Sequence, residues 1–167
     1  MKHLSKLSLL CGILATALSH TAASETTLRL GLGSLPNGNG NPYFSSARTG
    51  WYTLRAIFDT LTHLGPNLSI QPALAVSWEN TDDQTWVITL RNGVTFSNGE
   101  VLDANAVIES YAYLQSEEGM RESLAQDVKD IESMEALDSL TLRFVTTGPV
   151  PEFPRLMAII PIVAPAH

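Results

Sequence analysis

Two segments of strict alternation constrain the fold of this chain more than any other feature. In Thr85–Arg91 and in Leu140–Thr146, large apolar side chains recur at every second position. These side chains are Trp86, Ile88, Leu90, Leu140, Leu142 and Phe144. A period of two indicates strands that bury one face. Turn formers lie next to both segments, Asn92-Gly93 after the first and Asp138-Ser139 before the second. Because strands joined by short turns pair in opposite directions, the sequence predicts an antiparallel sheet.

Helices are expected to cover this sheet. Asp103 can cap a helix over Ala104–Gln115, which carries an apolar stripe at helical spacing. A second helix is predicted over Trp51–Phe58, on the same kind of stripe. The fold class is therefore expected to be α+β, an antiparallel sheet with covering helices.

The remaining elements are less regular. Val128–Ala136 is predicted to pair with Leu140–Thr146 as a hairpin, with a bulge or a local twist because its apolar residues break the alternation. Thr27–Leu32 alternates and predicts a first strand, and the turn formers of Gly33–Pro42 predict a loop after it.

Residues 1–23 are predicted to be a secretory signal peptide, which leaves 24–167 as the mature chain. Lys2 and Lys6 precede the apolar run Leu7–Leu18, and small residues end the segment at Ala22-Ala23. The run of about 12 residues is shorter than the roughly 20 that span a bilayer. The alternative is a buried N-terminal helix.

Charge and cysteine content narrow the class of protein further. The net charge of −7 makes binding to nucleic acid by charge unfavourable. The single cysteine, Cys11, lies inside the predicted signal peptide and follows Leu10 rather than a small residue, so we do not expect it to be lipidated. An acidic, exported chain without thiols indicates a periplasmic protein, and secretion beyond the cell is the alternative.

The sequence offers no arrangement typical of an enzyme. Outside the predicted signal peptide the histidines are His63 and His167, which are too far apart in the sequence to form a recognisable catalytic or metal-binding motif. The glycines of Gly31–Pro36 follow a predicted strand, but Pro36 stands where a dinucleotide-binding motif needs a third glycine. We therefore expect no catalytic residue, no metal and no cofactor.

Two motifs in the middle of the chain occur in a specific order. A Pro-x-Leu-Ala-x-x-Trp segment at Pro72–Trp78 precedes a Leu-Arg-x-Gly-Val-x-Phe-x-x-Gly segment at Leu90–Gly99. The wider set of segments is Phe58–Leu61, Gln71–Glu79, Thr85-Trp86, Leu90–Glu100, Ala104–Val107, Gly148-Pro149 and Pro161–Val163. Together they resemble the N-terminal portion of solute-binding family 5, the extracytoplasmic solute-binding proteins of peptide and nickel ABC importers. One departure is that Asn and Ala replace an acidic pair in Ala104–Val107.

The resemblance implies a function and partners. It implies part of a two-lobed periplasmic-binding-protein architecture (type II, cluster C), which captures peptides or related solutes for an inner-membrane ABC permease. Peptide, nickel-chelate, haem and sugar binders share the motifs, so the solute stays open. Because family members are several times longer, the alternative is a truncated fragment that acts as an interaction module or is a folding relic. The apolar stretch Leu156–Val163 is then expected to lie exposed, without its partner.

The loop Gly33–Trp51 is the expected ligand site. In the family the segment after the first strand lies near the cleft, and this loop is long, polar and carries aromatic side chains. We expect Ser34, Asn41, Tyr43 and Trp51 to contact the ligand. The alternative is that both aromatic side chains are buried against the sheet.

Export with cleavage is directly testable. N-terminal sequencing of the protein recovered from a periplasmic extract should begin near Ser24, because the small residues before that position suit signal peptidase. A product that still begins at Met1, or that carries a lipid, would contradict the predicted signal peptide.

Overall fold

The computed structural model describes residues 27, 29, 31, 40–44 and 48–165. The chain divides into two compact units, Met1–Gly31 and Leu32–His167. In the first unit only Thr27, Arg29 and Gly31 are described; all three are exposed and none lies in a strand. The strand expected over Thr27–Leu32 therefore falls largely outside the described residues.

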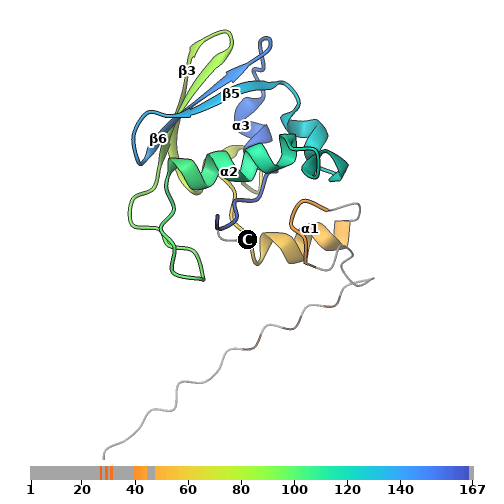
Figure 1. Ribbon diagram of the computed structural model, residues 1–167. Coiled ribbons are helices and arrows are strands. Elements are labelled where there is room, and N and C mark those ends of the chain that lie inside the picture. Colours follow the sequence, from red (N-terminus) through yellow and green to blue (C-terminus); the bar gives the residue numbers. More distant parts are fainter. Residues whose placement is uncertain (1–26, 28, 30, 32–39, 45–47, 166–167) are drawn as a thin grey trace, which may run out of the picture. The chain divides into compact units, whose positions relative to one another are not determined.

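The second unit combines a four-stranded antiparallel sheet with short helices (Figure 1). Its elements are α1 (Arg48–Arg55), β1 (Thr62–Leu64), β2 (Ile70–Pro72), β3 (Ala75–Asp82), β4 (Thr85–Leu90), α2 (Ala104–Gln115), β5 (Ile131–Ala136), β6 (Thr141–Thr146) and α3 (Phe153–Leu156), with 3₁₀ turns η1 (Gly119–Arg121) and η2 (Ala125–Val128) between α2 and β5. The sheet order is β3-β4-β6-β5, and β1 and β2 form a separate two-stranded sheet. In the part of the chain that the structure describes, no helix is long and apolar enough to cross a membrane.

The two alternating segments are the central strands, as predicted. In β4 and β6 buried and half-buried residues alternate along the whole strand. Trp86 lies opposite Phe144 and Ile88 opposite Leu142, so the apolar side chains of both strands point to the same face. The α+β fold class is confirmed.

Helix α2 also begins and ends where the sequence predicts. The carboxylate of Asp103 accepts a hydrogen bond from the Ala106 N–H at 2.9 Å, which satisfies a donor that the first helical turn leaves free. Figure 1 shows the helix lying across the sheet.

Four aromatic rings join the sheet to α2 and α3. The Phe144 ring of β6 lies 5.1 Å from that of Tyr111 in α2 and 5.1 Å from that of Phe153 in α3. The Trp86 ring of β4 stacks on Phe153 with centroids 5.8 Å apart. Both helices therefore pack on the same face of the sheet, and this is the core of the unit.

The apolar stretch Leu156–Val163 is largely buried, contrary to the expectation from the sequence. It was expected to lie exposed, yet Met157 and Ile160 are completely buried. Thr60 and Pro161 form an antiparallel bridge, so the stretch lies beside the segment that precedes β1. Its partner is within the chain, about a hundred residues earlier in the sequence.

The bounds of helix α1 also differ from the prediction. The helix was expected over Trp51–Phe58, but α1 spans Arg48–Arg55 and the chain turns after it. Ile57, which was assigned to the apolar stripe, is 67% exposed. Periodicity in this short segment therefore predicted a helix but placed both its start and its end too late in the sequence.

The first strand of the predicted hairpin is shorter than expected. Val128 closes η2, and β5 starts only at Ile131, where the chain pairs with β6. The predicted bulge is confirmed, because the register shifts between Ile131 and Ser133.

Replacement of Trp86 by alanine should reduce the free energy of unfolding by about 3–5 kcal/mol, as for large aromatic residues in other cores. The Trp86 side chain is 8% exposed and stacks on Phe153, so alanine would leave a cavity beneath α3. Urea unfolding followed by circular dichroism would measure the change. Trp78→Ala, at a half-buried position of edge strand β3, is the control and should cost less. Equal losses for the two variants would contradict the core position of Trp86.

Replacement of Asp103 by alanine should cost about 0.5–2 kcal/mol, because the Ala106 N–H would lose its capping acceptor. Thermal unfolding measures this loss. Asp103→Asn is the matched control, since the amide oxygen can accept the same hydrogen bond, and it should retain most of the stability. An alanine variant as stable as the original chain would show that the cap does not stabilise α2.

Candidate ligand-binding pocket

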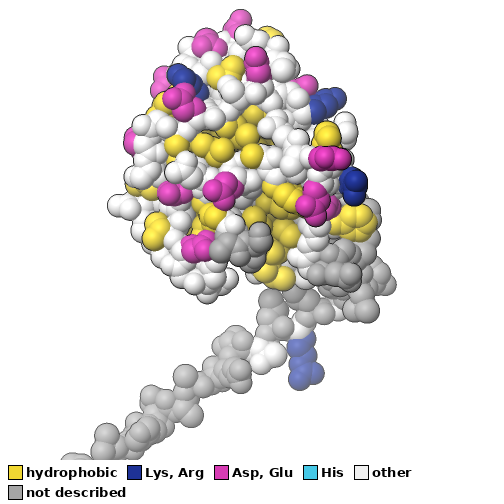
Figure 2. Space-filling view, in the orientation of Figure 1, with side chains coloured by type: hydrophobic (Ala, Val, Ile, Leu, Met, Phe, Trp, Pro, Cys, Tyr) yellow, Lys and Arg dark blue, Asp and Glu magenta, His cyan; other side chains and the backbone are white. Residues whose placement is uncertain are grey.

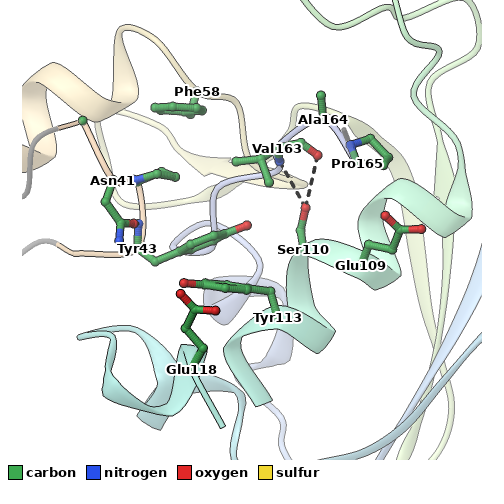
Figure 3. A pocket seen from close by; sticks show the side chains of 12 residues that line it. Asn41, Tyr43, Phe58, Glu109, Ser110, Tyr113, Glu118, Val163, Ala164 and Pro165 are labelled. Atoms are coloured by element: carbon green, nitrogen blue, oxygen red, sulfur yellow. Dashed lines mark hydrogen bonds between the residues drawn. The ribbon is translucent and has the colours of Figure 1, made fainter. Parts of the chain in front are cut away.

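Segments from both ends of the second unit meet at a pocket beside α2. The pocket has a volume of about 610 Å³ and opens to the surface. Its wall is formed by Gly40, Asn41, Pro42, Tyr43, Phe58, Glu109, Ser110, Tyr113, Glu118, Val163, Ala164 and Pro165 (Figure 3). Residues 40–43 come from the segment where the sequence placed the ligand site, and α2 supplies the opposite wall.

Asn41 fixes the segment 40–44 in place. Its Oδ1 accepts a hydrogen bond from the Tyr43 N–H at 2.8 Å, which closes a local turn. Its Nδ2 donates to Oε1 of Glu122, also at 2.8 Å. Asn41 therefore lines the pocket, but its side chain is already engaged in holding the segment against the region after α2.

Tyr43 forms a buried wall of the pocket. The residue is 4% exposed, and its ring lies 5.3 Å from that of Tyr113. Its hydroxyl is buried and makes no hydrogen bond of standard geometry among the described residues, and Figure 3 shows it pointing between Val163 and Ser110. Burial raises the pKa of the Tyr43 phenol to about 12, although the nearby Ser110 hydroxyl opposes the shift. The side chain is therefore a neutral phenol at physiological pH.

Ser110 connects α2 to the C-terminal part of the unit, and the sequence analysis missed it. Its hydroxyl accepts a hydrogen bond from the Val163 N–H at 3.1 Å and lies 3.4 Å from the Val163 carbonyl oxygen (Figure 3). The same hydroxyl can donate to the Ala106 carbonyl oxygen, 3.1 Å away within α2. The residue is 2% exposed. A serine three positions after Val107, on the apolar stripe of the helix, was the signal that could have identified it.

The charged residues that line the pocket are acidic. Glu109 comes from α2, and Glu118 from the residues that follow it. Burial raises the pKa of the Tyr113 phenol, and the Glu122 and Glu118 carboxylates raise it further because they repel a phenolate. Among the described residues that line the pocket there is no Lys, Arg or His.

Trp51 lies beside a different, smaller hollow. That hollow is also lined by Pro42 and Phe58, which belong to both walls. The Trp51 ring is half-buried and carries the Arg55 guanidinium 5.2 Å from its centre. Thus the structure brings Asn41 and Tyr43 to one pocket and places Trp51 next to it.

The other two expectations about this segment have different outcomes. Ser34 lies outside the described residues. The alternative of aromatic side chains buried against the sheet describes Tyr43 only in part, since the residue is buried but its ring packs on Tyr113 of α2.

The wall of the pocket offers several kinds of group that can contact a ligand. The wall offers aromatic surface, a buried phenol and carboxylates. Within the part of the chain that the structure describes, no cluster of three or more His, Cys, Asp or Glu side chains could hold a metal ion. Figure 2 shows acidic side chains spread over this face of the molecule, with few basic ones and with hydrophobic atoms exposed between them.

Comparison with known proteins identifies relatives that are binding proteins. The family model of the bacterial extracellular solute-binding proteins, family 5 Middle, matches residues 69–166. A nickel-binding periplasmic protein of Escherichia coli is 41% identical over 56 residues, which is 33% of this chain and 11% of that protein. A binding protein of Haemophilus influenzae is 37% identical over 73 residues, 43% of this chain and 14% of that protein.

Solved structures agree with these relatives. The nickel ABC transporter protein of Bacillus halodurans is 36% identical, with a TM-score of 0.58 over 66% of this chain and 23% of that one. The OppA protein of Burkholderia pseudomallei is 21% identical with a TM-score of 0.71, over 75% of this chain and 28% of that one, and shows the shared fold.

The chain thus spans less than a third of the length of the relatives it matches. The family model nevertheless covers more than half of this chain. The matched residues include the two motifs, Pro72–Trp78 and Leu90–Gly99, on which the resemblance mainly rests. The chain belongs to the bacterial extracellular solute-binding proteins of family 5.

Proposed function

We propose that this chain is part of the periplasmic substrate-binding component of an ABC importer, and that the pocket at Tyr43 contributes one wall of its ligand site. Family membership and the pocket together support the proposal. In this proposal residues 1–23 direct export, residues 24–167 form part of the solute-binding domain, and the loaded protein delivers its solute to an inner-membrane permease. The chain itself catalyses no reaction.

The observation that carries the proposal is the position of Tyr43. The family resemblance implies a ligand-contact segment after the first predicted strand, and residues 40–43 of that segment line the pocket. Aromatic surface with a few polar groups is typical of small-molecule sites. We therefore assign peptides or related organic solutes as ligands, and Asn41 and Tyr43 as parts of the site, with Trp51 at its border and Ser34 as a further contact.

The mechanism follows from how solute-binding proteins work. Periplasmic binding proteins close two lobes around the ligand, which excludes water from its polar contacts. An open pocket on one unit leaves those contacts exposed, and exposed contacts contribute little affinity. We therefore propose that this chain supplies part of a site that a second lobe completes in a protein of the length of its relatives.

A titration with short peptides tests the proposal. Tripeptides added to the ¹⁵N-labelled chain should bind with a Kd near 1 mM, about −4 kcal/mol, because only one wall is present. The shifted amide signals should be those of Tyr43, Ser110 and Tyr113.

Two variants make the titration specific. Tyr113→Ala removes an aromatic wall and should abolish measurable binding, whereas Tyr52→Ala, at an exposed tyrosine outside the pocket wall, should leave it unchanged. Signal changes confined to another surface would refute the pocket as the ligand site. Micromolar binding by a monomer would show that no second lobe is needed.

A further inference from the structure

We propose that Asn92 is a site of spontaneous covalent modification, at which the side-chain amide is converted to aspartate or isoaspartate. The inference goes beyond the proposed function and does not depend on the pocket. Asn-Gly pairs favour this reaction, because glycine has no Cβ that would hinder the approach of its backbone nitrogen. Two such pairs lie wholly within the described residues, Asn92-Gly93 and Asn98-Gly99, and all four residues are exposed. Their hydrogen bonds distinguish the two pairs.

The reaction needs no reagent other than water. The backbone nitrogen after the asparagine attacks the side-chain Cγ, so a new N–Cγ bond closes a succinimide ring. The Cγ–Nδ2 bond breaks, and the amide leaves as ammonia with the proton of the attacking nitrogen. Water then opens the ring at one of its two C–N bonds. Opening at Cγ gives aspartate, and opening at the backbone carbonyl carbon gives isoaspartate. The side-chain amide and the next backbone N–H must therefore both be free to move.

Both of these groups are held at Asn98. Its Oδ1 accepts a hydrogen bond from the Glu100 N–H at 3.1 Å, the local turn that fixes many asparagine side chains. The Gly99 N–H, which would have to attack, donates to the Phe96 carbonyl oxygen at 2.9 Å. The Phe96 N–H in turn donates to the Glu100 carbonyl oxygen at 2.8 Å, so the turn is closed from both sides. Succinimide formation at Asn98 therefore requires this turn to open.

Neither group is held at Asn92. Within the described part of the chain, the Asn92 side chain makes no hydrogen bond and the Gly93 N–H has no acceptor. Gly93 has a φ of +74°, and a Cβ added to it would meet nothing within 4 Å. The residue before the pair is fixed, because the Arg91 N–H donates to the Leu74 carbonyl oxygen at 2.8 Å. The freedom to react is thus confined to the exposed turn after β4.

The product changes this turn in two ways. Each event replaces a neutral amide by a carboxylate and so adds one negative charge to an already acidic chain. Isoaspartate also adds a carbon atom to the main chain, directly after Arg91, whose guanidinium donates to the Ala73 carbonyl oxygen. The charge makes the modified chain separable by isoelectric focusing, and the altered main chain is a substrate for a protein isoaspartyl methyltransferase.

Ageing of the full chain tests the proposal. The folded chain is kept at neutral pH for several weeks, and circular dichroism verifies that it stays folded. Samples are digested with pepsin at low pH, where the reaction is slow, and fragment-ion masses give the amide that remains at each asparagine. Asn98 should lose its amide about tenfold more slowly than Asn92, or slower still, because two hydrogen bonds must open first.

Two controls make the result specific. In guanidinium chloride the fold is lost, so the two Asn-Gly pairs should react at similar rates. The variant Asn92→Asp carries the charge on a normal main chain, and it should lack the methyl label that the methyltransferase adds to the peptide containing residue 92 of the aged chain.

Three results would overturn the inference. In the first, Asn98 reacts as fast as Asn92 in the folded chain. In the second, the folded chain keeps both amides while the unfolded chain loses both, which would show that the fold also protects Asn92. In the third, Asn92 reacts faster by the same ratio in guanidinium chloride, which would assign the difference to the neighbouring sequence and not to the hydrogen bonds.

Discussion

The contact of Phe144 with aromatic rings on two helices is the interaction on which the rest of this structure depends. Phe144 lies on a central strand and touches Tyr111 of α2 and Phe153 of α3, so one side chain joins the three elements of the core. The contact with Tyr111 packs α2 on the sheet, and Asp103 caps the first turn of the helix. Because Ser110 and Tyr113 lie on either side of Tyr111, the packing of the core determines which residues of α2 reach the pocket.

The second constraint is closure of the unit by segments distant in sequence. Thr60 bridges to Pro161, and the Val163 N–H donates to the hydroxyl of Ser110. The stretch around Pro161 and Val163 therefore lies against both the segment around Thr60 and helix α2. This closure buries an apolar stretch that would otherwise be exposed, and it brings Val163 and Phe58 into one pocket wall. Stability and the shape of the candidate site thus depend on the same contacts.

The sequence predicted the parts of the fold in which a local pattern determines the structure. Alternation gave β4 and β6, and a capping residue with a stripe gave α2, because both signals act over a few residues. Edge strand β3 was not predicted as a strand: most of its residues are exposed, so no alternation marks it. The pocket could be predicted only in part. Asn41 and Tyr43 were identified from their loop, but Ser110 depends on a contact with Val163, 53 residues away, which no local pattern shows.

The internal contacts of the pocket also bear on how it could bind a solute. Tyr43 is buried and packed on Tyr113, and Asn41 holds its backbone in a turn, so the aromatic wall is ordered before any ligand arrives. Ordering a side chain on binding costs about 0.5–1.5 kcal/mol, and a wall that is already ordered avoids that cost. Glu109 and Glu118, in contrast, are exposed and free of the hydrogen bonds that hold Glu122 to Asn41. In the proposed binding role, a wall that is already ordered favours selection of a solute by the shape of the part that contacts it.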